Sequence, residues 1–304
     1  MLKSIKHIQL IKCPQTFYKY NLLIFHMFEI YFLITIAIIW MIFAAVQDIK
    51  KREIANWLNF SLIIFALSFR FFYSFFSESF GFFYQGLIGL GIFFILGNIL
   101  YYIRFFAGGD AKLMIALGTI LPFSESFSSN LWIFSVFLLV FLFTGAIYTI
   151  FSSVFFSMKN LKEFKKEFNK QLTRNKKLIY PVLILGLAIM VFGFLDNIFL
   201  VLGILIFILP YIYVYAKAVD ESCMVKEIRT SQLTEGDWLY KDVKVGKKII
   251  KARWDGLKKE EINQIRKKYR TVLIKYGLPF SPVFLISFLI LLYLWKMGLW
   301  NPLW

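Results

Sequence analysis

Two aspartates, Asp48 and Asp110, lie at the ends of hydrophobic stretches in the segments AAVQDIKKREIANWL and FAGGDAKLMIALG. An ionised carboxylate near hydrocarbon is costly, about 2.5–3.5 kcal/mol at the centre of a membrane helix, so its presence calls for a function or a partner. Two such carboxylates on the same side of a membrane can share one proton and activate a water molecule. The pair therefore predicts an intramembrane aspartyl protease.

The residues that flank Asp110 fit this chemistry. Gly108 and Gly109 carry no side chains where an extended substrate would approach the backbone. Asp110 opens a helix, and the positive end of the helix dipole favours an ionised carboxylate. For Lys112 two roles remain open, because its ammonium can position Asp110 or meet a lipid phosphate.

Asp48 is followed by basic and polar residues in the sequence KKREIAN. If the helix that carries Asp48 continues past it, Arg52 and Asn56 share its face, because residues four positions apart are neighbours on a helix. We therefore expect Arg52 and Asn56 to support the site.

Composition identifies a membrane protein. Of 304 residues, 59% are hydrophobic and 37 are Phe, and the mean hydropathy is +0.67; soluble domains are nearer half apolar. The net charge of +17 would suggest a nucleic-acid partner in a soluble protein, but none is predicted here. With two His, two Cys and no CxxC pair, the sequence predicts no metal, no cofactor and no His-dependent hydrolase site.

Eight hydrophobic spans are expected, one of them short, so the predicted fold is an all-α polytopic membrane helical bundle of seven to eight spans. They are residues 24–47, 57–77, 81–103, 111–123, 131–156, 178–195, 197–216 and 280–297. The connections 48–56, 104–112, 157–177 and 217–275 then lie on one side and hold 29 of the 35 Lys and Arg residues. The positive-inside rule assigns this side, with Asp48 and Asp110, to the cytoplasm.

The stretch 111–123 is too short to cross a bilayer as one helix, since thirteen residues rise only about 20 Å against a core of about 30 Å. Without this span, however, the basic connections after it would face outward. We expect a helix that begins below the membrane surface, in a recess that water reaches.

Four regions follow along the chain. They are an N-terminal extension (1–26), a membrane bundle with the active site (27–216), a small cytoplasmic α+β module (217–278) and a C-terminal transmembrane helix (279–304). The extension carries four Lys on the side predicted to be external, so translation can begin at Met1 or at Met27.

The two longest basic connections have their own structure. Leu161, Phe164, Phe168 and Leu172 recur at helical spacing in SMKNLKEFKKEFNKQLTRNKK, which predicts an amphipathic helix on the inner leaflet or against an acidic partner. In the module, EGDWLYKDV and VGKKIIKARWDG predict short strands, and LKKEEINQIRKKYRTVLIKYG predicts a helix that ends at Gly277. The module's Asp237, Asp242 and Asp255 are predicted to be turn residues.

Several other residues in the spans are predicted to serve packing. Gly86, Gly89, Gly91 and Gly97 are expected to form a helix-packing surface. Arg70 and Arg104 are expected to extend to the membrane interfaces. Asn98 either makes a packing hydrogen bond or supports the Asp site.

The two Asp segments, DIKKREIANWLN and GGDAKLMIALG, together resemble the type IV prepilin peptidases, which are GxGD-type membrane aspartyl proteases. The C-terminal LTEGDWL, WDGLKKEEI and KYGLPFSPVFLISF are similar to the extension of archaeal members, the preflagellin (prearchaellin) peptidases. The resemblance covers roughly residues 28–120 and 230–290. It implies an endopeptidase that cleaves class III signal peptides at the cytoplasmic face, with a membrane-anchored prepilin or preflagellin as its partner and Asp48 and Asp110 as catalytic residues.

Two positions depart from the family pattern. Ala55 stands where the family often has Pro, and Ala107 stands at the first Gly of GxGD. The connection after Asp48 is also too short to hold the CxxC-bearing loop of bacterial relatives, so cleavage without N-methylation is expected. The oligomeric state stays open.

Two other classes of protein compete with the protease. An ion-coupled transporter also uses intramembrane carboxylates, but it is expected to have related halves with matched broken helices, which the sequence lacks. A non-enzymatic scaffold that docks partners through residues 217–275 gives no reason for the two Asp segments.

Overall fold

The computed structural model describes the backbone of residues 15–246 and 248–298 and the side chains of residues 28–246 and 248–298. Of the two predicted translation starts, Met1 lies outside the described residues with the rest of segment 1–14, and the backbone of Met27 lies within the first helix, Gln15–Lys51. The chain forms two compact units, residues 1–145 with 279–304 and residues 146–278. We call them the dyad unit and the second unit.

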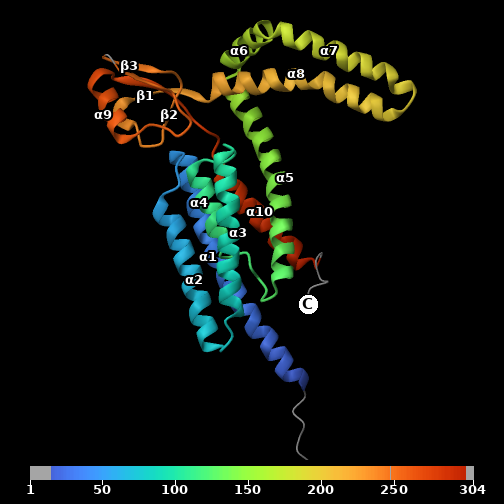
Figure 1. The fold of residues 1–304 in the computed structure, drawn as a ribbon, viewed down its shortest axis with the longest axis vertical. Helices are drawn as coiled ribbons and strands as arrows, with labels where there is room; N and C mark the ends of the chain where they lie inside the picture. Colours follow the sequence, from blue (N-terminus) through green and yellow to red (C-terminus); the bar gives the residue numbers. More distant parts are fainter. Residues whose placement is uncertain (1–14, 247, 299–304) are drawn as a thin grey trace, which may run out of the picture. The chain divides into compact units, whose positions relative to one another are not determined.

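The dyad unit is a bundle of helices (Figure 1). Its helices are α1 (Gln15–Lys51), α2 (Asn56–Phe76), α3 (Gly81–Tyr102), α4 (Gly108–Leu117), the first half of α5 (Phe127–Lys159) and α10 (Ser281–Lys296). Within this unit α1 ends, and α4 begins, near one end of the bundle, and α5 begins at the other end. The segment from α4 to α5 therefore returns along the length of the bundle.

Six helices of the described chain are long and apolar enough to cross a membrane, namely α1 from Phe28, α2, α3, α5, residues 176–194 and α8 (Asn197–Cys223). The shorter α10 has 16 residues and α4 has 10. The protein is thus a polytopic helical membrane protein, as the sequence predicts.

The buried guanidinium of Arg70 explains how a ten-residue helix fits inside the bundle. Its Nε donates to the carbonyl of Thr119 (2.8 Å), and its Nη2 donates to Ile120 (3.2 Å) and Pro122 (2.6 Å). Its Nη1 donates to the carbonyl of Phe82 (2.9 Å). Non-helical backbone at membrane depth is tolerated only where its polar groups are satisfied within the protein, and Arg70 satisfies the carbonyls after α4.

The prediction that Arg70 extends to an interface is therefore wrong, because its side chain is fully buried. A lone arginine in a hydrophobic helix reads as an interface residue by position alone. The irregular backbone of 119–122, which it binds, is about 50 positions away in sequence and left no local signal.

Glycines let α3 and α4 approach closely. A Cβ atom at Gly89 would lie 2.2 Å from the carbonyl oxygen of Gly118, and one at Gly97 would lie 2.9 Å from the Ile115 side chain. A Cβ at Gly86 would lie 2.5 Å from Cδ of Arg70. These three glycines are packing positions as predicted, whereas Gly91 is not: a Cβ there would meet no described atom within 4 Å.

The second unit contains the end of α5, α6 (Leu161–Arg174), α7 (Lys176–Val191), a 3-10 turn (Phe192–Phe194) and α8. The helices α7 and α8 form a hairpin and pack closely at Gly186 and Gly203. Added Cβ atoms at these glycines would lie 2.9 Å and 2.5 Å from the opposing helix. The amphipathic helix predicted within 157–177 is α6. Its Phe164 ring packs 5.6 Å from the Tyr215 ring of α8.

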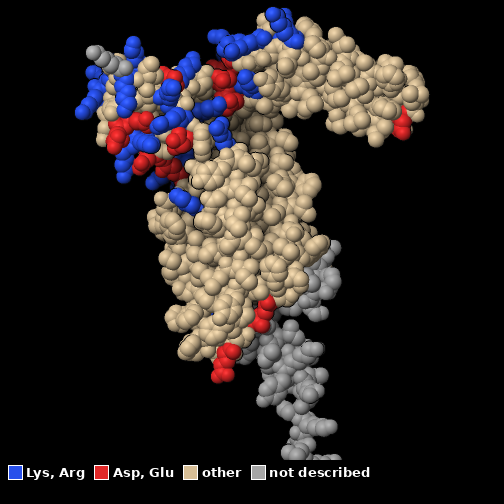
Figure 2. Space-filling view, viewed as in Figure 1, with Lys and Arg blue, Asp and Glu red and all other residues tan. Residues whose placement is uncertain are grey.

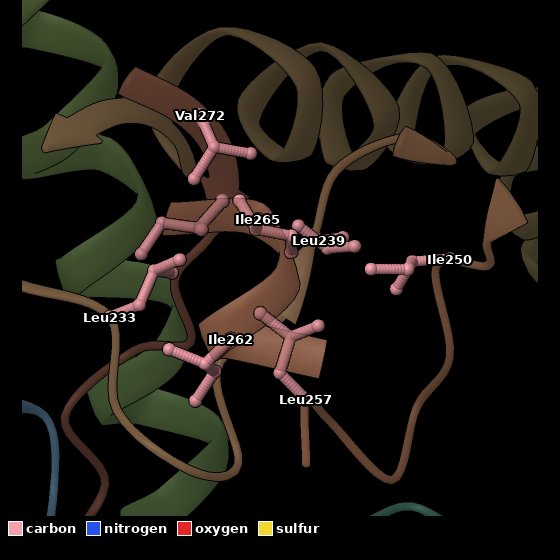
Figure 3. Packing of buried hydrophobic residues seen from close by; sticks show 8 residues of the cluster. Leu233, Leu239, Ile250, Leu257, Ile262, Ile265 and Val272 are labelled. Carbon is pink, nitrogen blue, oxygen red and sulfur yellow. The ribbon is translucent and has the colours of Figure 1, made fainter. Parts of the chain in front are cut away.

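The soluble module follows α8. Its strands are β1 (Val225–Arg229), β2 (Trp238–Leu239), β3 (Val243–Val245), β4 (Lys248–Ile250) and β5 (Thr271–Lys275), with α9 (Lys259–Lys268) between β4 and β5. The antiparallel order is β1-β5-β2, with Val225 opposite Lys275, and β3 pairs with β4. Figure 3 shows the apolar core between these strands and α9, formed by Leu233, Leu239, Ile250, Leu257, Ile262, Ile265, Val272 and Ile274.

The predicted helix that ends at Gly277 is wrong in its second half. The helix α9 ends at Lys268, and the segment TVLIK is strand β5, with Val272 and Ile274 buried and the residues between them exposed. This alternation of buried and exposed positions has the period of a strand. The preceding lysines and glutamates, which favour a helix, concealed the change of period.

Side-chain contacts tie the module to the end of α8. Lys275 Nζ lies 2.5 Å from the Asp220 carboxylate, and the Tyr240 hydroxyl donates to the Glu221 carboxylate. The bond to Glu221 raises the pKa of Tyr240 to about 12. Figure 2 shows Lys and Arg gathered over the module and along α6, whereas the sides of the dyad unit's helices are almost free of charge.

Candidate active site

Asp48 lies in the last turn of α1 and is buried, with 7% of its surface exposed. Its Oδ2 accepts a hydrogen bond from the backbone N–H of Ser281, at 2.9 Å, in the first turn of α10. This hydrogen bond ties the Asp48 carboxylate to the start of α10. The helix α10 therefore supplies a hydrogen-bond donor to Asp48 from 233 positions away in sequence.

Asp110 lies in the first turn of α4 and is also buried, at 8% exposed. It is close enough to Asp48 for the two charges to interact, and it accepts a hydrogen bond from the backbone of Ala107. The structure thus brings together the two aspartates that the sequence singled out. Like-charged groups at short range favour a pair that carries one shared proton.

The backbone conformation at Ala107, the first position of the family's GxGD motif, does not require a glycine. Ala107 is the residue before the first turn of α4, with φ of −73° and ψ of 163°, an extended conformation that any residue adopts. Its backbone reaches the carboxylate three positions later, as in a capping box.

Lys112 and Asn56 connect α4 to α2. The Lys112 ammonium donates to Asn56 Oδ1 at 2.6 Å, and this bond links α4 to the start of α2. Arg52 does not continue the face of Asp48. The helix α1 ends at Lys51, and Arg52 has φ of 60°, so the condition for Arg52 and Asn56 to share that face, a helix that continues, is not met.

The two glycines before Asp110 have different environments. Gly108 faces open space, where an added Cβ would have only the Tyr101 ring within 4 Å, at 3.9 Å. Gly109 packs against Ile54 instead, with an added Cβ 3.3 Å from that side chain. Only Gly108 therefore leaves room for an approaching chain.

At Ala55, where the family often has proline, a hydrogen bond to Gln47 takes the place of the proline ring. Ala55 keeps φ of −63°, the value to which proline is locked. Its backbone N–H donates to Gln47 Oε1 at 3.1 Å, a bond that proline could not make. The turn between Asp48 and Asn56 is thereby held without the proline ring.

A groove of about 840 Å³ adjoins the site between α2, α3 and α4. Its lining is mostly apolar and is polar near the start of α4; the residues are Asn59, Phe60, Ile63, Leu87, Leu90, Gly91, Phe94, Asn98, Tyr101, Gly108, Ala111, Lys112 and Ile115. Asn98 donates to the carbonyl of Phe94 at 2.8 Å. The groove begins at the residues around Asp110 and continues along the apolar parts of α2 and α3.

Three polar contacts of the site were not predicted from sequence: Ser281 with Asp48, Gln47 with Ala55, and Asn59 with Gly109. The Ser-Pro before an apolar run marks a helix start, but nothing in the sequence indicates what that start faces. Among the described residues, no three His, Cys, Asp or Glu side chains are grouped to hold a metal ion.

Comparison with known proteins gives an independent result for this region. Residues 35–151 match the model of the type IV leader peptidase family. The matched segment is less than half of the chain, and it contains Asp48, Asp110 and the residues that line the groove.

A relative of the leader peptidase segment is the preflagellin peptidase of Methanocaldococcus jannaschii, 32% identical over 82 residues. That stretch covers 27% of this chain and 35% of the relative, so the chain spans about a third of the relative's length. No solved structure matches the chain.

Proposed function

We propose that the protein is an aspartic endopeptidase of the membrane that removes the leader from prepilin- or preflagellin-type preproteins. One observation carries the proposal. Asp48 and Asp110 are both buried and close enough for their charges to interact, and both lie in the segment that matches the leader peptidase family. A membrane-anchored preprotein is the proposed partner, and the oligomeric state is left open.

The two carboxyl groups take different roles in this proposal. In this proposal Asp48, whose carboxylate is held by the Ser281 N–H, takes a proton from the attacking water. Asp110 holds the shared proton and donates a hydrogen bond to the scissile carbonyl oxygen. As the tetrahedral intermediate collapses, a proton passes to the leaving amine, so the pair returns to its starting state.

Other residues position this pair. Lys112 and Asn56 fix the start of α4 against α2, and Gly109 packs on Ile54 behind Asp110. Gly108 leaves the backbone before Asp110 open to a substrate chain. Arg52, with its left-handed backbone, ends α1 just after Asp48.

The purified protein in detergent, incubated with a prepilin or a preflagellin from the same source, tests the proposal. A product shortened at its N-terminus by the leader, seen by mass spectrometry and unmethylated, is the expected result. An unshortened preprotein under conditions where the protein remains folded would overturn the proposed activity.

The cytoplasmic side of the site is a separate proposal, supported by the 29 basic residues in the connections on that side. Cys223 is a poor reporter of sidedness because it is buried. In a Cys13→Ser, Cys223→Ser background, a membrane-impermeant thiol reagent should label Glu78→Cys in intact cells. It should label Lys241→Cys only after lysis, and labelling of Lys241→Cys in sealed cells would overturn the orientation.

A further inference from the structure

Asn59 is the least explained polar residue near the aspartates. Its side chain is 1% exposed, it lies one turn into α2, and it lines the groove. Its Nδ2 lies 3.5 Å from the carbonyl oxygen of Gly109, the residue before Asp110. Because this carbonyl can only accept, the amide is oriented with its nitrogen toward Gly109 and its oxygen away from it.

The Oδ1 atom of Asn59 is buried and accepts no hydrogen bond from any described residue. Most buried side-chain polar atoms have a partner, and an unsatisfied one costs stability, so each exception needs an explanation. An acceptor at the polar end of a groove is suited to a donor that enters the groove.

The groove has the shape and chemistry of a peptide channel beside the dyad. Its volume of about 840 Å³ lies in the size range of ligand sites. Gly108 lines the groove next to Asp110, and Gly91 lines it on α3. Neither residue has a side chain that would fill the groove. An extended peptide presents a backbone N–H at every second residue toward one side, which is the kind of donor that Oδ1 lacks.

We propose that this groove binds the preprotein chain beside its scissile bond, with Asn59 Oδ1 accepting one backbone N–H of that chain. The occupant is the stretch where the polar leader meets the apolar helix, since the groove changes from polar to apolar in the same way. The inference rests on the proposed function and names its substrate-binding residue. Asn59 thus contacts the substrate through Oδ1 and fixes the backbone before Asp110 through Nδ2.

The hydrogen bond is tested by changing both partners. Semisynthetic preproteins carry a single ester in place of an amide at successive positions around the scissile bond, so each lacks one N–H. One ester should lower kcat/KM about tenfold with the parent protein and hardly at all with Asn59→Leu. The reason is that Asn59→Leu already removes the hydrogen bond that this ester would remove. If every ester and Asn59→Leu act independently, Asn59 does not accept a substrate N–H.

The groove is tested at Gly91, where a new side chain meets no described atom within 4 Å. Leu favours a helix more than Gly does, so Gly91→Leu should leave thermal stability unchanged or higher while raising KM about tenfold or more. Gly91→Ala should have a smaller effect in the same direction. Normal KM in a folded Gly91→Leu protein would exclude the groove as the substrate site.

Photo-cross-linking identifies the occupant without requiring cleavage. A photoreactive residue replaces Gly91, or Ile95 as the control, which is 62% exposed outside the groove lining, in an Asp110→Asn background. Gly91 should capture the preprotein and Ile95 should not. Capture of lipid alone or of a second copy of the protein overturns the groove proposal. If the preprotein is captured but the protein with both aspartates intact does not cleave it, the proposed activity is overturned and the groove proposal stands.

Discussion

The aspartates of the module and those of the dyad unit share a side chain but differ in their surroundings. In the module, Asp237 accepts the Thr234 N–H at 2.8 Å and Asp242 accepts the Ala252 N–H at 2.7 Å. Asp242 and Asp255 are exposed to solvent. The partners of these three carboxylates are backbone N–H groups of nearby turns and, for Asp255, the guanidinium of Arg253.

Asp48 and Asp110 are instead buried, and they lie close enough for their charges to interact. Each also accepts a backbone hydrogen bond at a helix start, Asp48 from α10 and Asp110 from its own α4. What distinguishes Asp48 and Asp110 from the aspartates of the module is burial next to a second carboxylate, not the side chain itself. The predictions below test that distinction from the largest effect to the smallest.

The largest effect is expected at the dyad itself. Asp48→Asn and Asp110→Asn should each lower the cleavage rate about 10³-fold or more, because Asn can neither take the proton of water nor hold the shared one. Because the pair acts as a unit, the double variant should be scarcely slower than either single one. Cleavage is measured on the preprotein, and insertion and thermal unfolding serve as controls. Near-normal processing by Asp110→Asn would show that no carboxyl dyad operates here.

Arg70 should have the next largest effect, because it holds the backbone after α4 and hence the helix that carries Asp110. Arg70→Leu leaves four carbonyls without their donor, at about 1–3 kcal/mol each, so unfolding in detergent should occur at a clearly lower temperature and cleavage should fall. Arg70→Lys, which keeps one charged donor, should be intermediate. Equal stability of Arg70→Leu and the parent would mean that α4 is held by packing alone.

The contrast between the two regions also decides what could be predicted from sequence. Asp48 and Asp110 could be found because each combines an acid with a hydrophobic span, a conflict that is visible locally. The six long spans could be found because length and apolarity are local properties. The family resemblance added the same two residues from their neighbours.

What could not be predicted depends on contacts between distant segments. Nothing in FSPVFLISF indicates that the Ser281 N–H faces Asp48, and nothing near Arg70 indicates the carbonyls of 119–122. The segment TVLIK became a strand because it pairs with β1 and β2, whose own strand signals lie far away. Local patterns give the elements, and tertiary contacts give the environment of each side chain.

Substitutions of the module's acids should have a modest effect. Asp242→Ala removes an acceptor of a backbone N–H and should lower the free energy of unfolding of the module by about 1 kcal/mol. Asp242→Asn keeps an acceptor oxygen and should cost less. Both should cleave the preprotein within about twofold of the parent, since an exposed turn residue takes no part in chemistry. Loss of cleavage with Asp242→Asn would break the contrast between the two regions.

The smallest effect is expected at the turn between Asp48 and Asn56, where the dyad unit replaces a proline by a hydrogen bond. Gln47→Ala removes the acceptor of the Ala55 N–H and should lower the free energy of unfolding by about 1 kcal/mol, with a small loss of cleavage because Asp48 is adjacent. Ala55→Pro alone also breaks this bond, but the φ of −63° at Ala55 already suits proline. In the Gln47→Ala background nothing remains to break, so Ala55→Pro should restore about 0.4–1 kcal/mol by restricting the unfolded chain. Thermal unfolding of the four proteins forms a double-mutant cycle, and additive effects in that cycle would show that Gln47 does not hold the turn.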